Sequence, residues 1–250
     1  MKKLIRSIQA KYRYITSDKR PLPDFLIIGT QKGGTTSLYE YLKAHPALQS
    51  NITAKEVHFF DEQYDKGLAW YRSNFPKKKN GILYYEASPY YIFHPLAPQR
   101  IAHDLPNVKV IALLRNPIDR AYSSYQHQVR AGRESLSFEE AVNREAERLE
   151  GEEEKIIADP NYLSFNHRKF SYVARGKYID QLKNWERHVR KNQMLILESE
   201  AFWRDPDNTF REIFAFLGVD PVAVPTAKKH NTGNYKSSMD PAIREKLTAL

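Results

Sequence analysis

The sequence predicts a single α/β domain with a central parallel sheet flanked by helices. Short continuous apolar runs recur along the chain, each followed by a turn and a helical pattern, and such runs are typical of strands buried on both faces. Strands that alternate with helices favour a parallel sheet. The length of 250 residues and the hydrophobic content of 41% suit one domain with an ordinary core.

The first 20 residues are expected to form a basic amphipathic segment ahead of the domain, which we place at residues 21–250. The apolar residues of this segment recur at helical spacing and are Leu4, Ile5, Ile8, Tyr12 and Ile15. Polar residues interrupt the stretch before it reaches the length of a signal peptide. Two uses of the stripe are open, namely docking on the domain and weak contact with a membrane surface.

Four strands are expected, and each is a short, largely apolar run. They are residues 25–28, 81–86, 108–114 and 193–197. Helices are expected at 35–44, from Pro117 onward, at 177–189 with Leu182 and Trp185 facing inward, and from Pro241 onward. A further helix should start at the capping box Ser137–Glu140. It runs into the stretch 139–154, which carries eight glutamates and which we expect to be a solvated face.

The composition excludes several classes of protein. Because there are no cysteines, disulfide scaffolds, thiol nucleophiles and zinc–thiolate sites are excluded. A net charge of +9 favours a polyanionic partner. No run approaches the length of a membrane span. We therefore expect a soluble cytoplasmic protein, or one peripheral to the inner face of a membrane.

The residues between the first strand and the first helix predict a phosphate-binding loop. The segment Gly29–Ser37 places two glycines, Gly33 and Gly34, and the hydroxyls of Thr35, Thr36 and Ser37 where backbone N–H groups and a helix dipole converge. A nucleoside-triphosphate P-loop is the alternative, but its lysine follows the second glycine directly, whereas here the lysine is Lys32. A plain strand-to-helix turn is the third reading.

Five segments in order resemble the sulfotransferases that use 3′-phosphoadenosine 5′-phosphosulfate (PAPS), especially the heparan sulfate branch and its bacterial relatives. They are the loop QKGGTTSL after PDFLIIG, then KEVHFFD at 55–61, YEASPY at 85–90, LRNPIDRAYS at 114–123 and RGKY at 175–178. The resemblance spans residues 22 to 240. It implies a P-loop-like sulfotransferase fold, and an enzyme that moves a sulfuryl group from PAPS to a hydroxyl or amine of an acceptor.

The resemblance also implies roles for individual residues. Residues 32–37 would hold the 5′-phosphosulfate, with Lys32 beside the bridging oxygen, while Arg115 and Ser123 would hold the 3′-phosphate. An arginine fork suits a phosphate, although Arg115 could instead pair with Asp119 or Glu86. A C-terminal donor-binding loop would include Lys229 and Gly233. No metal is expected.

Glu56 is the general base that the resemblance implies, with His58 and Asp61 placing the acceptor. Phe59 and Phe60 beside the carboxylate suggest desolvation and a raised pKa. From the residues alone, His58 is the first choice of base near neutral pH. Glu86 and Ser88 are expected to contribute to the substrate site and to shape it, although Ala87 stands where several animal members have a lysine.

The acceptor is expected to be a saccharide or a small molecule, and nucleic acid is not expected. A group of aromatic side chains could stack on sugar rings or could belong to the core, namely Tyr64, Trp70, Tyr71, Tyr84, Tyr90, Tyr91 and Phe93. Two other functions stay open, a nucleotide kinase or NTPase and a polyanion-binding protein without catalysis.

Overall fold

A five-stranded parallel sheet forms the centre of the protein. The computed structural model describes residues 2–224 and 239–249. The strands are β1 (Phe25–Gly29), β2 (Leu48–Ser50), β3 (Leu83–Ala87), β4 (Lys109–Leu114) and β5 (Met194–Glu198). They lie in the order β2-β3-β1-β4-β5, and every neighbouring pair is parallel. The predicted fold class is therefore confirmed, and the four predicted strands agree with β1, β3, β4 and β5 to within two residues.

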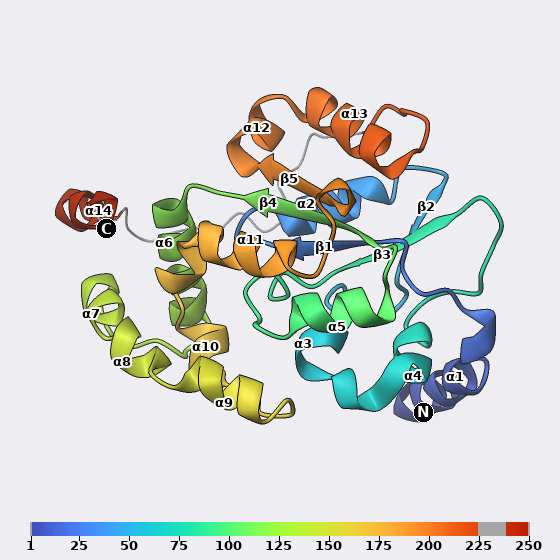
Figure 1. The fold of residues 1–250 in the computed structure, drawn as a ribbon, viewed down its shortest axis with the longest axis horizontal. Coiled ribbons are helices and arrows are strands. Elements are labelled where there is room, and N and C mark those ends of the chain that lie inside the picture. Colours follow the sequence, from blue (N-terminus) through green and yellow to red (C-terminus); the bar gives the residue numbers. More distant parts are fainter. Residues whose placement is uncertain (1, 225–238, 250) are drawn as a thin grey trace.

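Helices cover both faces and one end of the sheet (Figure 1). The α-helices are α1 (Lys2–Ile15), α2 (Thr35–Leu42), α3 (Phe59–Glu62), α4 (Gly67–Arg72), α5 (Ala97–Asp104), α6 (Pro117–Arg130), α7 (Phe138–Asn143), α8 (Glu145–Leu149), α9 (Glu152–Ala158), α10 (Phe165–Lys169), α11 (Tyr178–Glu186), α12 (Ser199–Arg204), α13 (Pro206–Leu217) and α14 (Pro241–Thr248). Short 3₁₀ helices are η1 (Ser17–Lys19), η2 (Tyr64–Lys66), η3 (Ala174–Gly176) and η4 (Lys191–Gln193).

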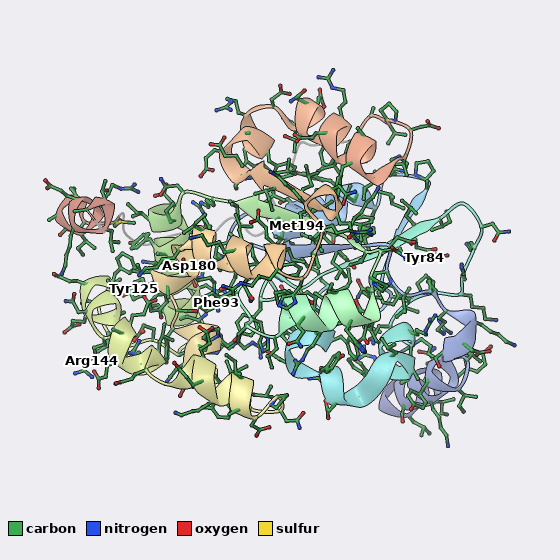
Figure 2. All side chains as sticks on the ribbon, in the orientation of Figure 1. Tyr84, Phe93, Tyr125, Arg144, Asp180 and Met194 are labelled. Carbon is green, nitrogen blue, oxygen red and sulfur yellow. The ribbon has the colours of Figure 1, made fainter. Side chains whose placement is uncertain are left out.

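The two sheet faces carry separate hydrophobic cores. On one face, Phe25 and Ile27 of β1 pack with α2, α12 and α13. On the other, Leu26 and Ile28 pack with α3, α4, α5 and α11, and Trp185 of α11 is fully buried as predicted. All five residues of β1 are buried, and burying one such aliphatic side chain contributes about 1.5–3 kcal/mol. Side chains fill the layers on both sides of the sheet (Figure 2).

A third cluster lies beside the carboxyl ends of the strands. Here α6 packs with α7 and with Phe170 and Tyr172. The capping box at Ser137 forms as predicted. The glutamate-rich stretch, however, is broken into α7, α8 and α9, and two of its glutamates are buried, so the prediction of one solvated helix is wrong. Glu145 accepts the backbone N–H groups of Val173 and Ala174, and Glu152 accepts the hydroxyl of Ser164.

The N-terminal helix lies against α4, and its apolar stripe does not dock on the domain. Residues 4 to 12 are all exposed, whereas Arg13 is half-buried. Of the two readings left open for the stripe, docking on the body is therefore wrong. Among the described residues, no helix is both long and apolar enough to cross a bilayer.

Candidate active site

The phosphate loop lies at the carboxyl end of β1, beside the end of β4. The Thr30 amide donates to the Leu113 carbonyl over 2.9 Å, and the Ser199 hydroxyl donates to the Gly33 carbonyl over 2.8 Å. A Cβ atom at Gly33 would lie 2.5 Å from the Leu113 oxygen, so only glycine fits there. The first helical turn of α2 follows, and the N–H groups of a first helical turn have no partner within their own helix, which suits them to bind an anion.

Arg115 is held against this loop. It follows the last residue of β4, and its guanidinium donates to the Lys32 carbonyl over 3.1 Å. Asp119 instead pairs with Arg244, and Glu86 accepts only hydroxyl groups, so neither proposed ion pair with Arg115 forms among the described residues. The predicted donor residues 32–37 and Arg115 are thus brought together.

Ser123 lies on α6, whose N-terminus starts directly after Arg115 and Asn116. The Asn116 side chain caps this helix by accepting the amides of Ile118 and Asp119. Ser123 is buried at 2% exposure, and the adjacent Ser124 contacts Gln31 of the loop. The predicted positions Lys229 and Gly233 lie outside the described residues.

Positive charges crowd around Lys32. Burial lowers the pKa of Lys32, and repulsion from Arg130, Arg115 and Lys55 lowers it further. Lys32 also has a backbone φ of 73°, and His58, at 53°, is the other non-glycine residue with positive φ among those described. A non-glycine residue holds this conformation only where its surroundings enforce it, which is typical of functional sites.

Lys55 links the phosphate loop to Glu56. Its ammonium lies 3.0 Å from the Thr36 hydroxyl and 3.4 Å from a Glu56 carboxylate oxygen. Although KEVHFFD was singled out in the sequence, Lys55 itself received no role there. Nothing in the sequence distinguishes Lys55 from the other lysines of the chain. Its role becomes visible only in the fold, where it lies beside Thr36 of α2.

Glu56, His58 and Asp61 form one chain of hydrogen bonds. The His58 ring lies between two carboxylates, with Nε2 3.0 Å from Glu56 and Nδ1 2.7 Å from Asp61. Burial alone would lower the pKa of His58, but Asp61 and Glu56 raise it to about 10. His58 is thus protonated at neutral pH and has no free lone pair, which argues against it as the base.

The prediction of a raised pKa for Glu56 is wrong. Its side chain is 43% exposed, while Phe59 and Phe60 turn into the core. Burial raises the pKa of Glu56 somewhat, but the hydrogen bond from His58 and the charge of Lys55 lower it to about 2. The carboxylate is therefore ionised across the neutral range, and it is the exposed end of the three-residue chain.

Glu86 and Ser88 lie beneath this chain, and both side chains are fully buried. Glu86 accepts hydroxyls of Tyr91, Ser88 and Tyr71 at 2.8, 2.8 and 3.2 Å. The Ser88 oxygen accepts the His58 amide at 3.1 Å. These residues fix the unusual backbone of His58 and do not reach the surface.

Asp61 is also buried but borders a cavity of about 170 Å³. Its Oδ1 atom has no hydrogen-bond partner among the described residues. Arg168 lines the same cavity, pairs with Glu62 and lies 3.4 Å from His58 Nε2. The ligand atoms of His58, Asp61 and Glu62 are close enough to surround a metal ion. The protonated ring of His58 is a poor ligand for one.

Arg175, the first residue of the RGKY segment, had no predicted role. It is 1% exposed and donates to the Gln31 side chain over 2.7 Å and to the carbonyls of His167 and Arg168. It also lies over the rings of Tyr90 and Phe93. It thereby ties the phosphate loop to α10. The contact with Gln31 joins residues 144 apart, which no local pattern reveals.

Most of the aromatic group belongs to the core. Tyr71, Tyr84 and Tyr91 are at most 1% exposed, and Phe59 stacks on Tyr71 with ring centroids 4.3 Å apart. The Tyr90 hydroxyl and the Nδ1 atom of His167 form a hydrogen bond of 2.7 Å within the core. The reading of these rings as core is confirmed, and the stacking of sugars on Tyr71, Tyr84 and Tyr91 is ruled out by their burial.

Comparisons with known proteins agree with this geometry. The sulfotransferase domain family matches residues 22–239. The chain is 33% identical over 208 residues to human heparan sulfate glucosamine 3-O-sulfotransferase 3B1. This match covers 82% of this chain and 48% of that protein. It is 34% identical over 208 residues to the bifunctional heparan sulfate N-deacetylase/N-sulfotransferase 1 of Caenorhabditis elegans. That match covers 81% of this chain and 23% of that protein. The chain thus spans about half or less of the length of these curated relatives.

A solved bacterial structure matches nearly the whole fold. The sulfotransferase from Alicyclobacillus acidocaldarius is 33% identical, with a TM-score of 0.72, and the match covers 92% of this chain and 91% of that one. The resemblance found in the sequence is confirmed. The chain belongs to the sulfotransferase domain family.

Proposed function

We propose that this protein transfers a sulfuryl group from PAPS to a hydroxyl or amine of a saccharide acceptor. One observation carries the proposal: hydrogen bonds and the loop backbone between them connect Arg115 to the exposed carboxylate of Glu56. Arg115 contacts the Lys32 carbonyl, and Lys55 contacts both Thr36 and Glu56. A site for the donor and a base for the acceptor thus share one edge of the sheet.

The residues present suit a donor with several negative charges. The Gly34 amide and the start of α2 would hold the 5′-phosphosulfate, because the Gly33 amide already donates to the Thr30 carbonyl, and Arg115 with Ser123 would hold the 3′-phosphate. Repulsion among Lys32, Lys55 and Arg115 supports this assignment, because a polyanion relieves it. No metal is required in this scheme, since the side chains supply the positive charge.

The transfer is a substitution at sulfur. The acceptor oxygen or nitrogen bonds to sulfur, the bond from sulfur to the bridging oxygen breaks, and adenosine 3′,5′-bisphosphate leaves. The acceptor proton passes to the Glu56 carboxylate. Lys32 stabilises the charge on the leaving oxygen, and one ion pair at about 4 Å with an effective dielectric near 20 is worth roughly 4 kcal/mol. His58 orients Glu56 and does not itself take the proton.

The saccharide is proposed from the relatives. Two of them act, by name, on glucosamine or on the nitrogen of heparan sulfate, and they sulfate oxygen and nitrogen respectively. The cavity of about 170 Å³ beside Asp61 is also lined by Glu62, Arg168 and Lys169, whose charged groups can hydrogen-bond the hydroxyls of a sugar. Both facts support a saccharide without specifying which one.

A transfer assay with labelled PAPS and a panel of saccharides tests the proposal. Glu56→Gln should lower kcat by about 10²–10⁴-fold while leaving bisphosphate binding intact, because general-base catalysis is worth that much. Lys32→Ala should lower kcat as well as donor affinity. Lys43→Ala is the matched control, because this exposed lysine caps the C-terminus of α2 and pairs with Glu40. Unchanged turnover in Glu56→Gln would contradict the assigned base.

Calorimetry separates the rival functions. Adenosine 3′,5′-bisphosphate should bind more tightly than ATP with magnesium, and Arg115→Ala should remove the preference for the 3′-phosphate. Tight ATP binding that ignores the 3′-phosphate would favour a kinase or NTPase. Binding of polyanions that survives Glu56→Gln without any transfer would favour the non-catalytic alternative.

A further inference from the structure

We propose that α1 and a neighbouring run of lysines bind the surface of an anionic phospholipid membrane. The surface consists of the exposed stripe of α1 together with η1 and residues 77–79, and we call it the basic face. This inference is independent of the proposed sulfotransferase reaction. It rests on apolar exposure, charge and position.

The apolar stripe of α1 points to solvent. At 100° per residue its members fall within an arc of about 100°, and they are exposed as follows: Leu4 65%, Ile5 49%, Ile8 60%, Tyr12 53% and Ile15 68%. The half-buried Arg13 lies on the opposite side of the helix and faces the body. A row of exposed aliphatic side chains on one short helix marks an interaction site, whereas single exposed residues do not.

Lysines flank this stripe from a distant part of the chain. Lys77, Lys78 and Lys79 are all exposed. The Lys78 amide donates to the Lys19 carbonyl of η1 over 3.1 Å, which places the run beside the end of α1. The Lys79 amide donates to the Tyr84 hydroxyl over 2.7 Å, and Tyr84 is labelled at the right of Figure 2, on the side where α1 lies in Figure 1.

The charge of the basic face is almost entirely of one sign. Within residues 4–19 and 77–79 the one acidic residue is Asp18, against the exposed basic residues Arg6, Lys11, Lys19, Lys77, Lys78 and Lys79. A helix with an apolar stripe and basic flanks lies in the plane of a membrane interface, where apolar burial and attraction to anionic lipid add together. At 14 residues, α1 is about 21 Å long, which suits lying on a bilayer.

A second copy of the chain fits this face less well. Pairing two identical faces would bring the same lysines opposite one another, and like charges repel. The position also suits a membrane, because the basic face lies at the amino ends of β1 and β3, whereas the phosphate loop lies at the carboxyl end of β1 (Figure 1). A bound membrane therefore leaves the active site open.

Sedimentation with vesicles tests the inference. Vesicles of equal parts phosphatidylcholine and phosphatidylglycerol should bind the protein at least tenfold more strongly than pure phosphatidylcholine, and added salt should weaken the binding. Changing all three of Lys77, Lys78 and Lys79 to Gln should weaken binding by about 100-fold, at about fivefold per lysine. The double change Leu4→Ser and Ile8→Ser should weaken it more than tenfold.

Two controls keep the outcomes distinct. Ile179→Ser removes an equally exposed aliphatic side chain on α11, and Lys191→Gln removes an exposed lysine of η4, so neither should alter vesicle binding. All variants should keep the circular-dichroism spectrum and the urea midpoint of the parent, which shows that they are folded. Equal binding to neutral vesicles, or no binding to anionic ones, overturns the inference. So does a dimer in sedimentation velocity that the Leu4→Ser and Ile8→Ser change dissolves.

Discussion

The buried carboxyl group of Glu86 should make the stability of the protein depend on pH. Glu86 has no exposed surface and accepts three hydroxyl groups beneath His58. Burial raises its pKa to about 7 even though the hydroxyls of Tyr91 and Ser88 favour the charged form. Glu86→Gln keeps the shape of the side chain and removes the titration.

The size of the effect follows from the shift. The pKa of Glu86 rises from 4.5 to about 7, and each pKa unit corresponds to about 1.36 kcal/mol of folding free energy, so the whole effect is about 3 kcal/mol. The unfolded chain loses the proton near pH 4.5, whereas the folded protein keeps it up to about pH 7. The stabilisation is therefore complete below pH 4.5 and is lost as the pH rises to 7.

Urea unfolding at pH 4.5 and pH 8 measures this difference. The parent should lose about 3 kcal/mol of unfolding free energy relative to Glu86→Gln between the two pH values, because the other titrating groups are common to both proteins. Glu139→Gln, an equal change on the exposed side of α7, is the control. If the parent and Glu86→Gln differ by the same free energy at both pH values, Glu86 does not titrate as reasoned.

Three further predictions concern the site. His58→Gln should let the pKa of Glu56 rise from about 2, so an acid limb should appear above pH 4 in the profile of kcat/KM, where the parent is flat; an identical profile would contradict the role of His58. Gly33→Ala should weaken binding of adenosine 3′,5′-bisphosphate more than tenfold in calorimetry, because the new Cβ atom lies 2.5 Å from the Leu113 oxygen. Gly81→Ala strains a backbone with a φ of 74° but meets no neighbouring atom, so it should lower stability without weakening nucleotide binding. Arg175→Lys loses the fork that reaches Gln31 and two carbonyls, so unfolding free energy should fall by about 2–3 kcal/mol in urea titrations; a loss below about 0.5 kcal/mol would show that these contacts are dispensable.

The fold was predictable because apolar runs and loop residues act locally. The strand around Phe25 and the glycine turn after it are readable as neighbours in sequence, and both form where expected. The strand β2 was missed because Leu48, Gln49 and Ser50 are too few and too polar to show a pattern. The break in the glutamate-rich stretch was missed because Glu145 and Glu152 find partners 28 and 12 residues away in the sequence.

The electrostatics of the site could not be predicted in the same way. Two phenylalanines after Glu56 suggested an apolar surrounding, but the backbone of His58 turns through a positive φ and directs the rings into the core. The pKa of Glu56 is then decided by the His58 ring and Lys55. Which way a side chain points depends on packing against residues such as Ser88 and Tyr91, and sequence order does not give this.

The hydrogen bond from Arg115 to the Lys32 carbonyl couples the two ends of the proposed donor site. The arginine that we assign to one end of the nucleotide also holds the backbone of the lysine that we assign to the other end. Under this assignment, any change at the strand end after β4 also alters the support of the Lys32 backbone. A change of sulfate donor would then require the loop and the strand end to change together, because neither can be adjusted alone.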